Sequence, residues 1–321
     1  MAEFKKGQTT MLDPVIRTDK LSRYFGSKPI VRDLNLRVPP GQVTALLGLN
    51  GAGKTTTIRI VMGLLRPTRG CCEVLQHDSS RLSVDVRMKI GYMVEGHYLY
   101  PNMRVRECAA FQRAGYSCWN EAQFDQIVDH FGIAQSDRIG HLSRGQRAGV
   151  SLALVLAPDP ELLVLDDPAL GLDPVSRRAL NETLIEFAGD GQRTVLLSSH
   201  LLDDVERIAD RVLLMIDGRL QVNTTLDDFR QRVTGYALGD VSIDPDRIAA
   251  VPGLIEARHL GNRLYLTVAD SDEETAAAVE RLNASSIEAM ELPFTDQVLA
   301  WLSRRRGRHS FLGRAKTGET V

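Results

Sequence analysis

The order of apolar and polar residues predicts an alternation of strands and helices over the first two thirds of the chain. Continuous apolar runs at 43–47, 162–165 and 195–198 are typical of strands buried on both faces of a parallel sheet. Ahead of them, alternating apolar residues with turn-forming sequences at 25–27 and 39–41 predict antiparallel strands. Helical spacing of apolar residues predicts helices at 56–62, 174–187 and 201–209. The expected fold class is α/β, with ligand loops at the carboxyl ends of the strands.

A helical insertion interrupts this alternation, and a second, smaller domain follows it. Apolar residues at helical spacing predict helices at 106–115 and 121–131, and short strands around 212–222 end the first domain. From about 236 to 302, the pattern predicts strand, short helix, a hairpin turning near 261–262, helix, strand and a final amphipathic helix, which is a small α+β domain. The expected domains are a flexible lead-in at 1–15, the main domain at 16–235 with a helical subdomain at about 96–150, the α+β domain at 236–302, and a disordered basic tail at 303–321.

Composition narrows the class of partner. With 39 Lys and Arg against 41 Asp and Glu, the net charge is −2, so we expect no nucleic acid as partner. No signal peptide is visible and no apolar run approaches the roughly 18 residues that span a bilayer, so work at a membrane would need a partner. Cys71, Cys72, Cys108 and Cys118 show no metal-ligand pairing, which indicates a reducing compartment. The basic tail from Arg304 is expected to be solvated, with attraction to anionic lipid as the alternative.

A phosphate-binding P-loop follows the first buried run directly. Residues 48–55 read Gly-Leu-Asn-Gly-Ala-Gly-Lys-Thr, in which the glycines let backbone N–H groups wrap around a β-phosphate at a helix N-terminus. Lys54 would reach the β- and γ-phosphates, and the Thr55 hydroxyl would bind Mg²⁺. The expected ligand is therefore a nucleoside triphosphate with Mg²⁺. The residues expected to contact it here are Gly48, Asn50, Gly51, Ala52, Gly53, Lys54, Thr55 and Thr56.

Four further segments follow the P-loop in a set order. They are Leu142-Ser143-Arg144-Gly145-Gln146, an apolar strand ending in Asp166 and Asp167, Gly171-Leu172-Asp173-Pro174, and Ser198-Ser199-His200. With the P-loop, these motifs resemble the ATP-binding subunit of ABC transporters over about residues 21–220. The resemblance is closer to bacterial ATPases that pair with separate ABC-2-type permeases. It implies a P-loop ATPase core with an antiparallel β subdomain and a helical subdomain, and ATP as the nucleotide.

The resemblance also implies a role for single residues. Asp166 would hold Mg²⁺ through water, Asp167 would orient or deprotonate the attacking water, and His200 would hydrogen-bond the γ-phosphate. Glu95 stands where the family usually has Gln, in a loop that touches Mg²⁺ and senses the permease. Phe25 is expected to stack on adenine, with Tyr24 as the alternative. The structural alternatives are a helix cap for the paired carboxylates, a satisfied polar side chain for His200, a core position for the aromatic ring and a surface position at a strand end for Glu95.

The motif at 142–146 implies a second ATPase subunit. In the family, the equivalents of Ser143, Gly145 and Gln146 act on the nucleotide held by the other subunit's P-loop. ATP would close such a dimer, of identical or different subunits, and hydrolysis would open it and drive an integral-membrane permease. Segment 96–106 is the candidate docking site for the permease, with packing inside the helical insertion as the alternative. We therefore expect a cytoplasmic protein held at the plasma membrane through that permease.

Three departures from the family pattern bear on the mechanism. Glu95 in place of Gln puts an extra negative charge near Mg²⁺ and the γ-phosphate, and it is common in the closer group. Arg144 stands where the family usually has glycine, and arginine is familiar there in the closer group. Asp167 stands where the family normally has Glu, and one methylene fewer withdraws the carboxylate by roughly 1.5 Å, which can cost about 10²-fold in rate. The expected function is the ATP-hydrolysing subunit of an exporter, with slow hydrolysis. The alternative is an ATP-binding regulatory or assembly module with little sustained hydrolysis.

Overall fold

The computed structural model describes residues 13–239 and 245–303, and the chain divides into two compact units after Leu226. This division falls earlier than the boundary expected after residue 235, because β12 (Val233–Gly239) is a central strand of the second unit's sheet. Residues 1–12 of the expected lead-in and residues 304–321 of the expected tail lie outside the described residues. At Val15 the chain is already bonded, since its N–H donates to the Val38 carbonyl and its carbonyl accepts from Leu75 N–H.

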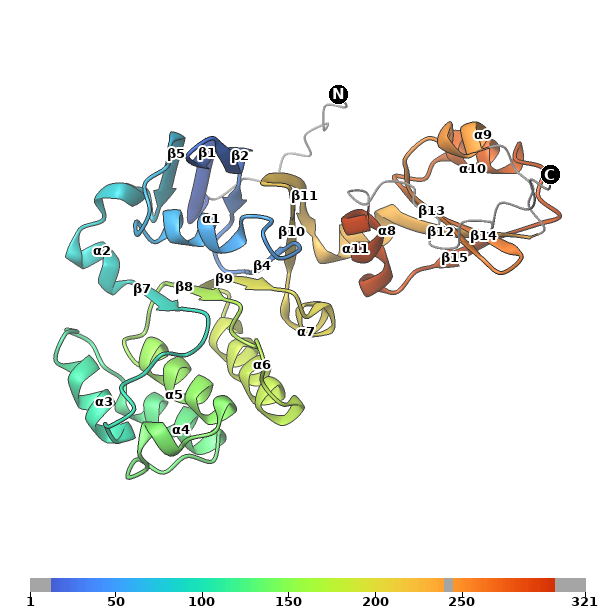
Figure 1. The fold of residues 1–321 in the computed structure, drawn as a ribbon. Helices are drawn as coiled ribbons and strands as arrows, with labels where there is room; N and C mark the ends of the chain where they lie inside the picture. The colour runs from blue at the N-terminus through green and yellow to red at the C-terminus, as the bar shows by residue number, and fades with distance from the viewer. Residues whose placement is uncertain (1–12, 240–244, 304–321) are drawn as a thin grey trace, which may run out of the picture. The chain divides into compact units, whose positions relative to one another are not determined.

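A mainly parallel sheet forms the centre of the first unit (Figure 1). Every neighbouring pair in it is parallel except β10 with β11. All residues of β4 and β8 are buried, which confirms the interpretation of the continuous apolar runs as strands covered on both faces. In spatial order the strands are β11 (Arg219–Thr225), β10 (Arg211–Ile216), β4 (Val43–Leu47), β9 (Thr194–Ser199), β8 (Leu162–Asp166) and β7 (Ile90–Met93).

An antiparallel sheet and helix α1 (Lys54–Val61) complete the core on one side of this sheet. Leu21, Val31, Leu46 and Ile58 come from the two sheets and α1 and are buried in one hydrophobic cluster. The expected antiparallel strands are confirmed, and the turn-forming sequences lie at their ends. These strands are β1 (Ile16–Phe25), β2 (Lys28–Leu34), β3 (Arg37–Val38), β5 (Arg69–Val74) and β6 (His77–Asp78).

The helical insertion is a separate layer, drawn in green in Figure 1. Helix α4 packs against α5, where a Cβ at Gly149 would collide with the Phe131 ring, so glycine allows this close approach. The insertion's last helix runs to Leu156, beyond the expected end near residue 150. The helices of the first unit after α1 are α2 (Val84–Met88), α3 (Val105–Arg113), α4 (Glu121–His130), α5 (Arg144–Leu156), α6 (Pro174–Ala188) and α7 (Leu202–Ile208).

The second unit has its own antiparallel sheet and core. In chain order its elements run β12, α9, β13, β14, α10, β15, which is the split β-α-β topology of ferredoxin-like domains. Leu238, Leu266 and Val279 are buried between the sheet and its helices. The expected α+β domain and its hairpin at 261–262 are confirmed. Its elements besides β12 are α8 (Leu226–Arg232), α9 (Pro245–Ala249), β13 (Leu254–Leu260), β14 (Arg263–Ala269), α10 (Glu273–Glu280), β15 (Ser286–Glu291) and α11 (Phe294–Ser303).

Candidate functional site: a nucleotide site at the strand ends

The P-loop joins the end of β4 to the start of α1. Neighbouring backbone lies so close to it that two of its positions have no room for a side chain. A Cβ at Gly48 would lie 2.5 Å from the Met215 carbonyl oxygen. Gly53 has φ +104° as the residue that precedes α1, and a Cβ there would lie 2.8 Å from the Ile30 carbonyl oxygen. Helix α1 therefore begins at Lys54, two residues earlier than expected. The remaining expected contact residues of this loop, Asn50, Gly51, Ala52 and Thr56, lie in the same turn and the first turn of α1.

Lys54 is buried, and its ammonium stays within the loop. Its Nζ donates to the Gly48 carbonyl at 2.7 Å and to the Leu49 carbonyl at 3.4 Å. Burial lowers the pKa of Lys54, while the charges of Asp167, then Asp166 and Glu95, act in the opposite direction. A bound phosphate would replace the carbonyl partners and add the compensating negative charge that a buried ammonium needs.

The carboxylate of Asp166 lies at the end of β8, next to the P-loop helix. Because β9 lies between β4 and β8, Ser198 on β9 pairs in register with Asp166. The Ser198 hydroxyl donates to Asp166 Oδ1 at 2.8 Å, and the Thr55 hydroxyl donates to the same oxygen at 3.1 Å. Ser198 also accepts the backbone N–H of Asp167 at 2.9 Å. Ser198 thus fixes both acidic residues, a role that the sequence motif alone did not indicate.

Asp167 faces His200 rather than open solvent. Nδ1 of His200 lies 2.7 Å from Oδ2 and 2.9 Å from Oδ1 of Asp167. Burial raises the pKa of Asp167, and the nearby His200 and Lys54 act in the opposite direction. Its backbone has φ +50°, a conformation that Asp tolerates better than most residues. His200 was expected on the γ-phosphate, and here its Nδ1 orients the carboxylate expected to activate water.

The oxygen atoms at this site suit a hard cation. The Thr55 hydroxyl and the Asp166 carboxylate are the oxygen ligands that Mg²⁺ prefers. The structure, over the residues it describes, holds no group of three or more His, Cys, Asp or Glu side chains that could bind a metal. Mg²⁺ would therefore depend on phosphate oxygens and water for its other positions, as is usual for nucleotide-bound Mg²⁺. Glu95, exposed after β7, contributes charge that raises the pKa of Lys54.

The start of α5 is built separately from the P-loop. Ser143 caps the helix, since its Oγ accepts Gln146 N–H at 3.1 Å and Gln146 Oε1 accepts Ser143 N–H at 3.0 Å. A Cβ at Gly145 would collide with the Ser176 side chain in the first turn of α6. In Figure 1, α5 lies in the green helical layer, apart from α1. The three residues expected to bind nucleotide from this motif are thus positioned by helix capping and packing.

Comparison with known proteins identifies the family. The family model described as ABC transporter matches residues 31–170. The daunorubicin resistance ATP-binding protein DrrA3 of Streptomyces coeruleorubidus is 30% identical over 91% of this chain and 97% of its own length. The chain belongs to the ABC transporter family. It is an ATP-binding cassette that hydrolyses ATP, which confirms the predictions of family, nucleotide and enzyme class.

Other relatives and solved structures agree with this assignment. The bacitracin transport ATP-binding protein BcrA of Bacillus licheniformis is 30% identical over 70% of this chain and 74% of its own length. A solved ATP-binding subunit of an ABC transporter is 29% identical, with a TM-score of 0.61, and the match covers 68% of this chain and 92% of the solved one. The cassette MJ0796, solved as a dimer in a post-hydrolysis state, is 20% identical. The match has a TM-score of 0.59 and covers 66% of this chain and 98% of the solved one, and it supports the fold alone.

The residue expected to stack on adenine lies at the end of β1. Phe25 is 51% exposed, and the Arg23 guanidinium lies over its ring, 4.7 Å from the centroid. Tyr24 is half-buried, and its backbone N–H donates to the Thr68 hydroxyl. Of the two rings, Phe25 is therefore the more exposed, which is what a ring needs if it is to stack on a base.

His97, in the loop after β7, is a buried residue that the sequence did not single out. Its side chain is 2% exposed, and neither ring nitrogen has a hydrogen-bond partner of good geometry. Burial, and then the charges of Arg144 and Arg147, lower the pKa of His97 to about 4, while the nearby Pro168 carbonyl acts in the opposite direction. The ring is therefore neutral at physiological pH. The sequence around His97 does not show that its side chain is buried, so this became apparent only in the fold.

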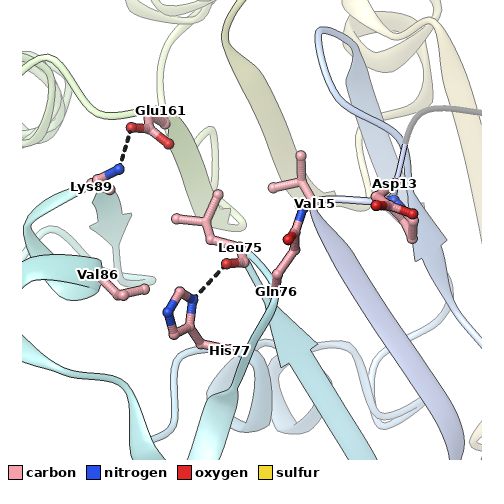
Figure 2. A pocket seen from close by; sticks show the side chains of 9 residues that line it. Asp13, Val15, Leu75, Gln76, His77, Val86, Lys89 and Glu161 are labelled. Carbon is pink, nitrogen blue, oxygen red and sulfur yellow. Dashed lines mark hydrogen bonds and ion pairs between the residues drawn. The ribbon is translucent and has the colours of Figure 1, made fainter.

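The cassette also has a hollow outside the nucleotide site, with a volume of about 310 Å³ (Figure 2). Lys89 and Glu161 form an ion pair of 2.8 Å across one side of it, and Nδ1 of His77 lies 2.6 Å from the Leu75 carbonyl oxygen. Because these polar groups already pair with one another, we propose no ligand for the hollow. No helix in the described ranges of the cassette is long and apolar enough to cross a bilayer.

Proposed function

We propose that the cassette is the ATP-hydrolysing subunit of an exporter and drives a separate integral-membrane permease from the cytoplasmic face. Relatives named for bacitracin transport, daunorubicin resistance and Nod factor export support this assignment. In such an arrangement the permease selects the substrate, and the cassette supplies the cycle of ATP binding and hydrolysis.

We propose further that two ATPase subunits share each ATP. The observation that carries this proposal is the separation of the motifs within one chain. Lys54, Asp166 and Asp167 converge at the strand ends, whereas Ser143 is exposed and caps α5 in the helical layer. The N-terminal end of α5 carries a positive dipole, which suits the γ-phosphate of a nucleotide held by another subunit.

Solution mass measures this association directly. In the Asp167→Asn variant, which removes the carboxylate expected to activate water, Mg·ATP should convert monomer to dimer in light scattering. Lys54→Ala should abolish the conversion together with ATP binding. Ser143→Arg should block the dimer by size and charge while leaving ATP binding intact. A monomer at saturating Mg·ATP in the Asp167→Asn variant would contradict the shared site. A native complex that contains a different second ATPase would make the pair a heterodimer.

The surface around the loop after β7 fits the permease contact. Tyr98 is 84% exposed, Tyr100 is 57% exposed and Phe111 on α3 is 61% exposed. The rings of Tyr100 and Phe111 pack edge to face with centroids 5.8 Å apart. Adjacent exposed aromatic rings are typical of protein contact surfaces, and these rings would suit the apolar face of an amphipathic helix of the permease.

Co-purification tests this surface. Tyr100→Ser with Phe111→Ser should remove the cognate permease from an affinity-purified complex, because both exposed rings that pack on each other are lost from the proposed contact. Leu64→Ser is the matched control, since Leu64 is equally exposed after α1 but lies outside the patch. Retention of the permease by the double variant would overturn this docking site.

A further inference from the structure

Arg23 contacts the aromatic ring that is expected to stack on adenine. Alternate residues of a strand point to the same face, and β1 ends at Phe25, two residues after Arg23. The Arg23 guanidinium lies over the Phe25 ring, 4.7 Å from its centroid. Phe25 is nevertheless 51% exposed, so the contact covers part of the ring and leaves about half of the side chain open to solvent.

The same guanidinium is bonded to the chain that follows the P-loop helix. Nη1 of Arg23 donates to the Arg66 carbonyl at 3.1 Å, in the loop between α1 and β5. The Nε atom of Arg23 is buried and has no hydrogen-bond partner in the part of the chain that the structure describes. This side of the cation is therefore shielded from water, and a cation–π contact is strongest where the cation is desolvated.

The hairpin that carries Phe25 also approaches the P-loop itself. The Ile30 carbonyl of β2 lies so close to Gly53 that a Cβ there would come within 2.8 Å of its oxygen. Lys28, which pairs with Phe25, precedes Ile30 by two residues, or roughly 7 Å of strand. A base attached to a diphosphate in the P-loop would therefore have the Phe25 ring within reach.

We propose that Arg23 is a positioning residue for the base of the nucleotide, because it holds the Phe25 ring in the orientation on which adenine stacks. This inference rests on the proposed ATPase function and on adenine stacking at Phe25. An exposed ring without such a contact would sample several rotamers, and a base that binds it would have to order it. The guanidinium orders the ring beforehand, since the Arg66 carbonyl holds the guanidinium in turn.

Mg·ADP and Mg·pyrophosphate separate the affinity for the base from the affinity for the phosphates. Both place phosphates in the P-loop, and neither carries the γ-phosphate through which the proposed dimer would form. Competition against the fluorescent nucleotide MANT-ADP measures both Kd values in each variant. The measurement involves no hydrolysis and no permease, so it is independent of the shared site.

Arg23→Ala should weaken only the ligand that contains a base. The Kd of Mg·ADP should rise by about three- to tenfold, as expected when one side chain must be ordered on binding, and that of Mg·pyrophosphate by less than about twofold. An unchanged Kd for pyrophosphate also shows that the fold is intact. Arg23→Lys keeps the charge without the planar fork and should recover part of the affinity. Arg17→Ala is the matched control, an exposed arginine near the start of β1, and should change neither Kd.

Phe25→Ser completes a double-variant cycle. Alone it should raise the Kd of Mg·ADP by at least about fivefold, because a stack between base and ring is lost. Arg23→Ala should then add little, because Arg23 acts through the ring. The proposal is overturned if Arg23→Ala leaves the Kd of Mg·ADP unchanged or lowers it, weakens both ligands alike, or adds in full to Phe25→Ser.

The two single variants also distinguish which part of the argument fails. A loss in Phe25→Ser without a loss in Arg23→Ala would keep adenine at Phe25 and refute the role of Arg23 alone. No loss in Phe25→Ser would refute adenine stacking there and, with it, the role of Arg23. Neither result would contradict the proposed exporter function, which the dimer and the permease complex test separately.

Discussion

Asp167 is held at two points, by His200 at its carboxylate and by Ser198 at its backbone N–H. The position of its carboxylate should therefore control the rate of hydrolysis. We propose that the short Asp side chain, where the family normally has Glu, makes hydrolysis slow while Lys54 and Thr55 retain tight Mg·ATP binding.

Lengthening this side chain should accelerate the reaction. Asp167→Glu is expected to raise kcat by up to about 10²-fold, because the carboxylate advances toward the attacking water. Steady-state phosphate release at saturating Mg·ATP measures the change. Asp166→Glu is the control, since moving the Mg²⁺-side carboxylate should lower kcat instead. An unchanged or lower kcat in Asp167→Glu would disprove the explanation for slow hydrolysis.

Two adjacent thiols should differ sharply in reactivity. Burial raises the pKa of Cys72 to about 12, whereas Cys71 is exposed beside it on β5. At pH 8 the thiolate of Cys72 is populated at only about 10⁻⁴, so iodoacetamide should modify Cys71 and spare Cys72. Peptide mass spectrometry reads both sites, and both should react in urea. Equal modification in the folded protein would mean that β5 opens.

At the scale of single residues, the sequence predicted those site residues that belong to motifs of consecutive residues. The P-loop, the paired carboxylates and His200 each belong to a contiguous motif, and the structure brings them together at the strand ends. The contact of Ser198 with Asp166 and the burial of His97 were not predicted, because they depend on which strand lies beside which and on what the fold covers.

At the scale of elements, the first turn of α5 contains both the residues that pack it against α6 and the residues of the motif expected to contact nucleotide. Ser143 and Gln146 cap it reciprocally, and Gly145 lets it approach α6. The glycine that the family motif links to nucleotide contact thus has a structural reason within its own chain. Any variant at this position must therefore be judged for stability before its activity is interpreted.

The close contact between Gly145 on α5 and Ser176 on α6 can be tested with a pair of compensating variants. Gly145→Ala is expected to lower the free energy of unfolding by about 1–3 kcal/mol, because its Cβ overlaps the Ser176 side chain. Ser176→Gly alone should cost about 1 kcal/mol through lower helix propensity. In the double variant the losses should be less than additive, as urea unfolding can measure. Fully additive losses would place the strain of Gly145→Ala elsewhere.

Element type followed the apolar pattern wherever the pattern was long or continuous. The buried runs became β4, β8 and β9, and helical spacing became α4 and α6. The sequence reading missed β5, because its residues, Arg-Gly-Cys-Cys-Glu-Val, are mostly polar or small and mostly exposed, although the strand lies between β1 and β6 in its sheet. It also missed β7, which is only four residues long and ends in a loop.

At the scale of the whole molecule, the two units each have a sheet and a core of their own. The match to DrrA3 covers 91% of the chain, so it reaches well into the second unit. Only the first unit carries the nucleotide motifs. Nucleotide should therefore stabilise one unit selectively.

The two tryptophans can report the units separately. Trp119 lies in the first unit and Trp301 on α11 in the second, so Trp119→Phe and Trp301→Phe each leave a single reporter. Mg·ATP at 100-fold its Kd should stabilise the unit reported by Trp119 by about 2.7 kcal/mol in urea and leave the Trp301 transition unchanged. Lys54→Ala should abolish the shift. A common shift of both transitions would show that the units unfold together.

The sequence by itself determined the ligand and the family of this protein, because the P-loop and its companion motifs are each local and their order along the chain is diagnostic. Only the tertiary structure decided how the site is assembled. The strand order β4, β9, β8 brings Thr55, Ser198 and Asp166 onto one oxygen. These contacts join residues far apart in the chain, and their energy depends on burial and distance, which no local pattern contains.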